Sequence, residues 1–256
     1  MRSKLLFYGT SAAPPSPRRG FSCIGLIGGD SSVTLFDCGD GSVNKILSAG
    51  TDVLSISRIF ITHFHSDHLS GLTQIVETMG IRKRRNDLDV YGPKGLMDYF
   101  STVEKITRVA SNREFQIKLH ELAPNNNESF DQISISAFEM THTIPCIGYR
   151  IDAGDFVLAY TGDTEPCEKS IELGANSDYF IHEATFLQRE KSLARKSKHS
   201  TASEAGRSAR KANARNLILT HVNDDHETEQ EMLREVRSIF ENTKVAHDGL
   251  ELVLSV

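Results

Sequence analysis

The segment that most constrains this chain is ITHFHSDHLSGL at residues 61–72, which follows an apolar run and crowds histidines and aspartate together. Histidine and aspartate are poor core residues, and no turn requires them in this number. His63 and His65 are two residues apart, so both side chains can point to one side of an extended segment. Asp67 and His68 lie in the turn that enters a predicted helix, where they can face a second ion. The spacing H-x-H-x-D-H therefore predicts two adjacent metal half-sites rather than a solvated charged loop.

Three further potential ligands stand at the ends of apolar segments that are predicted strands. His142 ends ISISAFEMTH, Asp163 ends DFVLAYTGD and His221 ends NLILTH. A metal ion needs several lone-pair side chains in one small volume, and strand ends with the loops beyond them can supply these. Together with the cluster at 63–68, these residues predict a dinuclear metal site. Three other histidines are interpreted as surface or loop residues: His120, His226 and His247.

The order of predicted elements divides the chain into two similar halves, at about 1–122 and 132–256. Each half begins with short apolar segments separated by turn residues, which is typical of antiparallel strands, and continues with helices mixed with strands. The polar stretch APNNNESFD at 123–131 is the predicted connection between the halves. We expect one α/β domain over residues 1–256, with two sheets face to face and helices outside them.

Local signals predict two helix starts and one turn. Pro93 suits the first position of a helix that follows the strand LDVYG. Thr201 and Glu204 have the T-x-x-E spacing of a capping box, so a second helix is expected from about residue 202. The turn at 37–41, DCGDG, is interpreted as structural because aspartate and glycine favour such bends.

Composition restricts the function classes. The formal net charge of -5 does not favour a protein that coats nucleic acid by bulk electrostatics. The four cysteines form no CxxC pair, and the apolar part of MRSKLLFYGT is too short for a secretory leader. No segment approaches the roughly 18 apolar residues that a membrane span requires. We therefore expect a soluble, cytoplasmic protein with reduced thiols and no membrane partner.

The motifs resemble a known family. THFHSDHLSGL, followed by a strand-end histidine, TGDT and LTH, is similar to the metallo-β-lactamase superfamily. Within it, FYGTSAAPP, DVYGPKGL, TGDTEP, IHEATF and KHSTASEAG resemble the tRNase Z (ribonuclease Z) group of phosphodiesterases, and the resemblance covers nearly the whole chain. It implies an αββα four-layer sandwich of the metallo-β-lactamase type, built from two similar halves.

The resemblance also implies roles for individual residues. One zinc ion is expected on His63, His65 and His142, and a second on Asp67, His68 and His221. Asp163 is expected to bridge the two ions, which could also be manganese or iron. The implied catalytic residues are Asp67 together with Glu183 of IHEATF and His199 of KHST, the last two forming a pair that protonates the leaving oxygen. That chemistry is needed because hydrolysis of a phosphodiester expels a poor leaving alkoxide. His182, beside Glu183, is interpreted as structural.

Substrate contacts are expected near His199. The helix that begins at Thr201 could bind a substrate phosphate at its N-terminus, or Thr201 could serve only as a cap. Two basic runs, 81–86 and 191–199, bear on a polyanionic substrate. The first is interpreted as a solvated face. The second leads directly into His199, which makes Lys198 a candidate substrate-binding residue together with Thr201.

One departure from the family leaves the substrate open. Family members that process tRNA carry a long flexible arm between the third metal-ligand motif and GDT, whereas His142 and Asp163 are here separated by a segment that holds only two strands and a turn. RNA, such as a tRNA precursor with a 3′ trailer, is the first candidate substrate. A cyclic nucleotide or other small phosphodiester, or an ester, lactone or lactam, is the alternative. A non-catalytic metal-held binding module is disfavoured by the intact ligand set. The resemblance suggests a homodimer.

Overall fold

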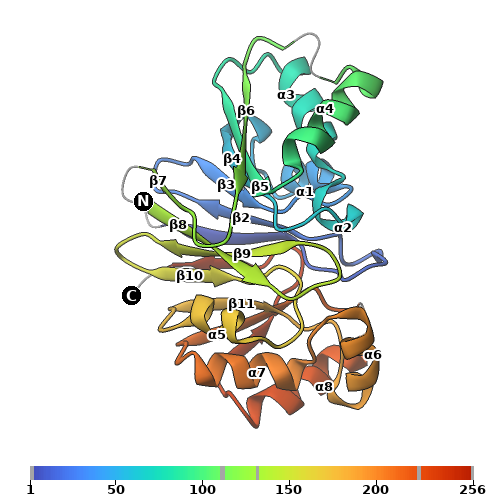
Figure 1. Cartoon of the computed structure of the whole chain (residues 1–256), viewed down its shortest axis with the longest axis vertical. Coiled ribbons are helices and arrows are strands. Elements are labelled where there is room, and N and C mark those ends of the chain that lie inside the picture. The colour runs from blue at the N-terminus through green and yellow to red at the C-terminus, as the bar shows by residue number, and fades with distance from the viewer. Residues whose placement is uncertain (1–2, 110–112, 131–132, 224–225, 255–256) are drawn as a thin grey trace.

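The computed structural model describes residues 3–109, 113–130, 133–223 and 226–254, apart from the side chains of 226 and 227. Within this part of the chain, two seven-stranded sheets lie face to face (Figure 1). The first sheet has the order β14 (Glu251–Val253), β1 (Lys4–Gly9), β2 (Cys23–Ile27), β3 (Val33–Phe36), β4 (Ile56–Phe60), β5 (Leu88–Pro93) and β6 (Ile117–Leu122). The second has the order β13 (Thr243–Val245), β12 (Asn216–Thr220), β11 (Tyr179–Glu183), β10 (Val157–Tyr160), β9 (Cys146–Asp152), β8 (Ile133–Met140) and β7 (Asn127–Phe130).

Helices cover both outer faces of this pair of sheets (Figure 1). Over the first sheet lie α1 (Ser42–Ser48), α2 (Ser66–Leu69), α3 (Leu72–Ile81) and α4 (Leu96–Thr107), with the 3₁₀ turn η1 (Val53–Ser55). Over the second lie α5 (Glu168–Gly174), α6 (Lys191–Ser197), α7 (Ala202–Lys211) and α8 (His226–Arg237), with η2 (Gln188–Glu190). The αββα four-layer arrangement predicted from the sequence is confirmed. No helix in the described ranges is both long and apolar enough to cross a bilayer.

Three buried clusters fill the three interfaces between the four layers. The middle cluster, between the sheets, is rich in aromatic rings. The ring of Phe60 stacks on Tyr91 with centroids 4.5 Å apart, and it meets Tyr149 edge-on at 5.2 Å. Ile59, its neighbour in β4, belongs instead to the cluster beneath the helices. Both faces of the strand are therefore buried, which fixes its register because a slip by one residue would exchange the faces.

Strand direction brings the polar strand ends to one edge of the sandwich. Strands β3 to β6 are parallel to one another, and so are β10 to β13. The carboxyl ends of parallel strands form the usual binding edge of an α/β sheet. At or just beyond these ends stand Asp37 (β3), His63 (β4), Asp163 (β10), Glu183 (β11) and His221 (β12).

Some local predictions are wrong. Pro93 does not begin a helix: it is the last residue of β5, where it pairs in register with Leu122 of β6, and α4 begins at Leu96. The stretch 123–131 is not only a connection, because it contains β7, an antiparallel edge strand on β8. Both errors have the same cause. β6 and β7 are short strands with many polar residues, and their pairing with a neighbour decides their structure.

Gly71 and Gly80 provide a matched test of the packing around the turn at 65–71. A methyl group at Gly71 would lie 2.3 Å from the carbonyl oxygen of Gly39 and 2.8 Å from that of Cys38, so the backbone would have to move. We expect Gly71→Ala to lower the free energy of unfolding by about 1–3 kcal/mol.

Gly80→Ala, in α3, is the control, because a methyl group there meets no atom within 4 Å. It should raise the free energy of unfolding by about 0.5–1 kcal/mol, since alanine favours a helix interior over glycine. Urea denaturation of both variants measures the difference. Similar changes in the two variants would contradict the close packing at Gly71.

Candidate metal centre

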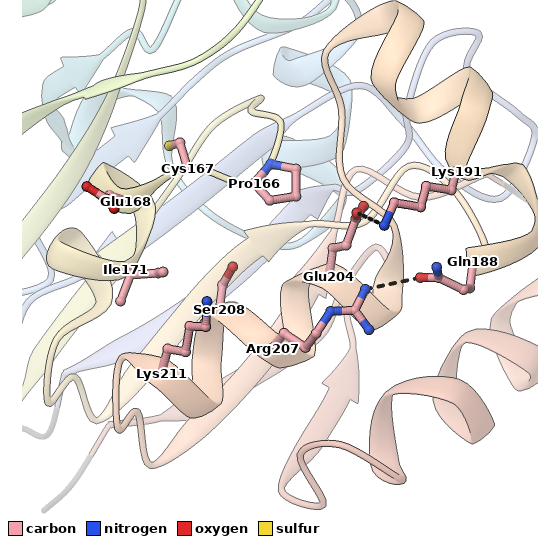
Figure 2. A pocket seen from close by; sticks show the side chains of 10 residues that line it. All are labelled: Pro166, Cys167, Glu168, Ile171, Gln188, Lys191, Glu204, Arg207, Ser208 and Lys211. Carbon is pink, nitrogen blue, oxygen red and sulfur yellow. Dashed lines mark hydrogen bonds and ion pairs between the residues drawn. The ribbon is translucent and has the colours of Figure 1, made fainter.

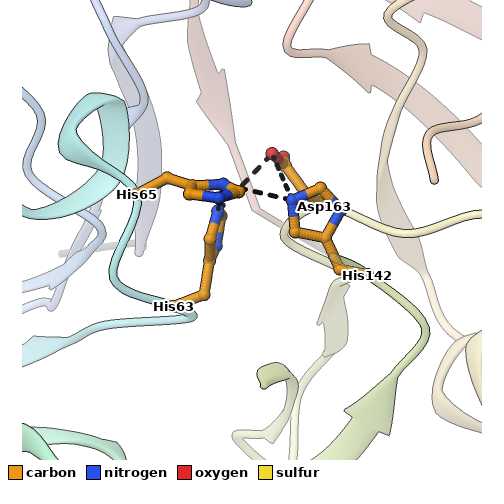
Figure 3. Close-up of side chains that lie close together, drawn as sticks. All are labelled: His63, His65, His142 and Asp163. Atoms are coloured by element: carbon orange, nitrogen blue, oxygen red, sulfur yellow. Dashed lines mark hydrogen bonds and ion pairs between the residues drawn. The ribbon is translucent and has the colours of Figure 1, made fainter. Parts of the chain in front are cut away.

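Three histidines and Asp163 converge at the edge of the sandwich where the parallel strands end (Figure 3). His63 and His65 follow β4, His142 follows β8 and Asp163 follows β10. Nε2 of His63 lies 3.0 Å from Nδ1 of His65, and Nε2 of His142 lies 3.2 Å from the same nitrogen. One ligand atom from each of these four residues lies within 4.8 Å of the others. An imidazole and carboxylate set of this size matches one divalent metal ion.

A second group of the same kind adjoins the first and shares Asp163 with it. Asp67, His68 and His221 complete this group, again with all ligand atoms within 4.8 Å. Oδ2 of Asp67 is 3.3 Å from Nε2 of His221 and 3.7 Å from Nε2 of His68. The structure thus gathers all seven predicted ligands into two overlapping groups.

The carboxylate of Asp163 is the point that the two groups have in common. Its Oδ2 lies 3.4–3.8 Å from Nε2 of four histidines, two from each group: His63, His68, His142 and His221. Nε2 of His68 and Oδ1 of Asp163 are buried, and neither has a hydrogen-bond partner among the described residues. A buried polar atom without a partner is costly, and metal coordination would satisfy both atoms. The residues present therefore fit a dinuclear metal site.

Burial sets the protonation of the first group. It holds the pKa of His63 well below the usual value and also lowers the pKa of His65 and of His142. These imidazoles are neutral at physiological pH, which is the form that coordinates a metal. Burial also opposes the charged form of His68, but Asp163 and Asp37 outweigh it and raise the pKa of His68 well above the usual value.

Asp37 orients His68, and the interpretation of the 37–41 turn as only structural is therefore wrong. The fully buried carboxylate accepts a hydrogen bond at 2.7 Å from Nδ1 of His68. It also accepts hydrogen bonds from the Tyr160 hydroxyl and from the backbone and hydroxyl of Thr62. With Nδ1 engaged, Nε2 of His68 is the nitrogen presented to the shared site. The sequence signal was the same as for the ligands: Asp37 follows the end of β3.

Two other candidate ligands are oriented in the same manner. Nδ1 of His142 donates to the backbone carbonyl of Lys198 at 3.0 Å, and Nδ1 of His221 lies 2.9 Å from the hydroxyl of Thr185. Lys198 has a left-handed backbone at the end of α6, with φ of 55°. Lys198 therefore contacts the site through its backbone carbonyl, whereas the sequence suggested a role only for its charged side chain.

A carboxylate–imidazole pair lies beside the second group. Oε1 of Glu183, which is fully buried, accepts a hydrogen bond at 2.7 Å from Nδ1 of His199. Burial disfavours the charged imidazole, but the adjacent carboxylate outweighs it and raises the pKa of His199 to about 9. His199 therefore carries a proton at neutral pH. His182 occupies the other face of β11, buried against the ring of Phe180, as the structural interpretation predicted.

Thr185 joins this pair to the candidate metal ligands, and sequence reasoning missed it although it lies in IHEATF. Its hydroxyl is 3.0 Å from Oε2 of Glu183, 3.2 Å from Nδ1 of His199 and 2.9 Å from Nδ1 of His221. A carboxylate only accepts, so the hydroxyl donates to Glu183 and accepts from an imidazole. The Thr185 side chain thus fixes the Glu183 carboxylate relative to His221, a candidate metal ligand.

The site opens to solvent through a cavity of about 360 Å³. The lining includes His65, Asp67, Asp163, Thr185, Phe186, Ser197, His199 and His221. Thr201 is not part of the lining. It is fully buried, and its hydroxyl bonds to Glu204 in the capping box that begins α7. This position favours the capping role over contact with a substrate.

The basic runs differ in their surroundings. In 81–86, Arg84 is buried and donates to three backbone carbonyls, so this residue is structural, while most of its neighbours are exposed. In 191–199, Lys191 forms an ion pair with Glu204 at 3.2 Å, and Arg195 and Lys196 are exposed on α6.

The three histidines that were interpreted as surface or loop residues lie away from the candidate metal centre where they are described. His120 pairs with Asp89, His247 lies at the surface, and the side chain of His226 is outside the described residues.

Comparison with known proteins identifies the family. The family model of the β-lactamase superfamily domain matches residues 34–222. Ribonuclease Z of Microcystis aeruginosa is 31% identical, with 96% of this chain and 95% of the relative covered. Ribonuclease Z of Archaeoglobus fulgidus is 30% identical, with 98% of each chain covered. The chain belongs to the ribonuclease Z family.

Solved structures agree with this assignment. The short form of human tRNase Z is 26% identical to this ribonuclease Z homologue and superimposes with a TM-score of 0.86, covering 99% of this chain and 100% of the human one. The metallo-β-lactamase fold protein YhfI from Bacillus subtilis has the same TM-score at 20% identity, covering 98% of this chain and 99% of its own, and shows the fold. The predicted metallo-β-lactamase fold is confirmed.

This ribonuclease Z homologue is shorter than the Archaeoglobus fulgidus protein. The alignment with the Archaeoglobus fulgidus protein has 308 positions, more than the 256 residues of this chain, so the relative carries segments that this chain lacks. Between His142 and Asp163 the structure has only β9 and β10, joined by a short turn. A long arm is absent from this fully described stretch, as the sequence predicted.

Asp37→Asn tests the orientation of His68. Asparagine tolerates the left-handed backbone of Asp37, whose φ is 57°, but it presents one acceptor oxygen where the carboxylate presents two. We expect metal affinity to fall about 10- to 100-fold, the usual effect of losing a partner that orients a ligand. Titration against a competing chelator measures this, with Asp40→Asn, at an exposed position in the same turn, as control. Equal affinities in both variants would contradict the role of Asp37.

Proposed function

We propose that this protein is a dinuclear-metal phosphodiesterase that cleaves RNA endonucleolytically, with the 3′ trailer of precursor tRNA as its substrate. The observation that carries the proposal is the pair of buried Glu183 and partly exposed His199 beside two overlapping groups of metal-ligand type. Similarity over nearly the whole chain to proteins named ribonuclease Z supports the same class of substrate.

In this proposal each of the two groups holds one divalent ion. The residues involved are His63, His65 and His142 for one ion, Asp67, His68 and His221 for the other, and Asp163 for both. Imidazole nitrogen with carboxylate oxygen suits zinc, and manganese or iron would also be accepted by these donors. Such ions supply Lewis acidity toward a phosphoryl oxygen and lower the pKa of water. Asp67 lines the cavity, where its carboxylate can hold a proton of the attacking water.

His199 is the proposed general acid. Its Nδ1 is held by Glu183, which leaves Nε2 as the nitrogen that can give a proton to the leaving oxygen. The raised pKa keeps that proton in place at neutral pH. When the bond between phosphorus and the leaving oxygen breaks, the proton moves to this oxygen, and the neutral imidazole is reprotonated from solvent. Glu183, fixed by Thr185, stabilises the charged imidazole before transfer.

A small phosphodiester is the alternative substrate, favoured by one observation: the chain lacks a long arm between His142 and Asp163. A panel with purified, metal-loaded protein separates the candidates. It contains a 3′-extended tRNA precursor, a cyclic nucleotide, bis-p-nitrophenyl phosphate and a lactam. Cleavage of the precursor at a single site supports the RNA proposal. Hydrolysis of the cyclic nucleotide without cleavage of RNA supports the alternative, and lactam hydrolysis alone refutes both.

We further propose that the protein works in the cytoplasm as a homodimer. All four cysteines are free thiols, which agrees with a reducing compartment. The dimer rests on the family resemblance alone, and light scattering on the purified protein tests it. A mass of one chain at micromolar concentration would refute the dimer.

His199→Ala tests the general acid. We expect the rate on RNA to fall about 10²- to 10⁴-fold, the usual contribution of a positioned acid. The loss should be much smaller with bis-p-nitrophenyl phosphate, because nitrophenolate leaves without a proton. His120→Ala, at a half-buried histidine paired with Asp89, is the control and should change neither rate. Equal losses on both substrates in His199→Ala would remove His199 from this role.

A further inference from the structure

A second pocket lies outside the metal centre, on the helical layer that covers the second sheet (Figure 2). It has a volume of about 400 Å³ and lies between α5, α7 and the segment that runs from η2 into α6. None of its lining residues belongs to the candidate metal centre or to the Glu183–His199 pair. The activity proposed above therefore leaves this pocket without a role.

Cationic side chains form one wall of the pocket. Arg207 and Lys211 lie one turn apart on α7, and Lys191 approaches from α6. Two carboxylates also line it. The charge of Glu204 is already compensated, because its Oε1 lies 3.2 Å from Nζ of Lys191 and its Oε2 serves the capping box. Glu168, exposed at the start of α5, is the remaining negative charge on the rim.

Arg207 is the residue that points most clearly to an anionic ligand. It is half-buried, and its guanidinium donates to the neutral amide oxygen of Gln188 at 3.2 Å. Within the described part of the chain, neither Arg207 nor Lys211 forms an ion pair. A guanidinium that is partly desolvated and lacks a carboxylate can bind a phosphate through its remaining N–H groups.

The opposite wall carries Pro166, Cys167 and Ile171, with Glu168 of the same segment beside them (Figure 2). A pocket with cations on one side and apolar groups on the other matches one nucleotide unit, which has a phosphate and an uncharged ring face. A free inorganic anion would use only the cationic side. The size and the mixed lining therefore favour a nucleotide within a chain over a small ion.

Both walls are continuous with the segments that carry the metal centre. Pro166 and Cys167 follow Asp163 in the same loop, and α7 follows His199 directly. We propose that this pocket binds a backbone phosphate of the RNA substrate outside the scissile bond, with Arg207 and Lys211 as the phosphate contacts. The inference rests on the proposed RNA substrate. It gives the chain a substrate contact outside the metal centre, although the stretch between His142 and Asp163 holds no long arm.

The test compares charge removal inside and outside the pocket. Arg207→Gln and Lys211→Gln should each raise KM for a 3′-extended tRNA precursor about five- to tenfold. The slope of log KM against log salt should become shallower by about 0.7–0.9 for each variant. Neither variant should change kcat, or the hydrolysis of bis-p-nitrophenyl phosphate. Arg210→Gln removes the same charge from an exposed position on the same helix that does not line the pocket, and it should match wild type.

Glu168→Gln gives a result of opposite sign. Removing the negative charge on the rim should lower KM for the precursor, whereas KM should not change if the precursor does not enter this pocket. Thermal denaturation checks that each variant is folded. If Arg207→Gln is unstable, Arg207→Lys is the substitute, because it keeps the positive charge but loses the bidentate hydrogen bonding of the guanidinium. It should raise KM less than Lys211→Gln.

Two negative outcomes can be told apart. If wild type cleaves the precursor while Arg207→Gln and Lys211→Gln behave as Arg210→Gln does, the pocket is no RNA site and the proposed activity stands. If wild type neither cleaves nor binds the precursor, as measured by fluorescence anisotropy, the RNA substrate and the pocket proposal are both refuted.

Discussion

The position of the Asp163 carboxylate is the constraint on which the rest of the site depends. Its Oδ2 lies 3.4–3.8 Å from four imidazole nitrogens, two of them from the segment after β4 of the first sheet. Such an arrangement of buried polar atoms is unfavourable unless a cation occupies it. The two sheets must also meet closely. Gly162 allows this, because a Cβ at that position would lie 2.8 Å from Cβ of Thr62.

The groups around the candidate ligands form a connected hydrogen-bond network that couples fold and chemistry. Asp37 accepts hydrogen bonds from Thr62, His68 and Tyr160. Because Tyr160 lies in the second sheet, this carboxylate links both sheets to the candidate ligand His68. Thr185 performs a similar task between His221 and Glu183. In each case one side chain forms hydrogen bonds both to a candidate ligand and to a second residue of the site. We therefore expect changes in these residues to affect metal affinity and proton transfer more than the free energy of unfolding.

Much of this site could be predicted from the sequence, because the candidate ligands follow local rules. H-x-H-x-D-H after an apolar strand, and ligand-type residues at three further strand ends, predicted the seven side chains that the structure brings together. Asp37 obeys the same strand-end rule, but its place in a DCGDG turn offered a simpler explanation. The backbone carbonyl of Lys198 and the strands β6 and β7 could not be predicted, because long-range contacts decide them. The pocket at Arg207 depends on the packing of three helical segments, which no local pattern specifies.

In the proposed site, two metal ions occupy the overlapping groups and share Asp163. Anomalous diffraction from crystals of the metal-replete protein, combined with elemental analysis of the same sample, tests it most directly. We expect two ions per chain, one among His63, His65 and His142 and the other among Asp67, His68 and His221, with Asp163 in contact with both. A single ion, or two ions of which neither contacts Asp163, would contradict it.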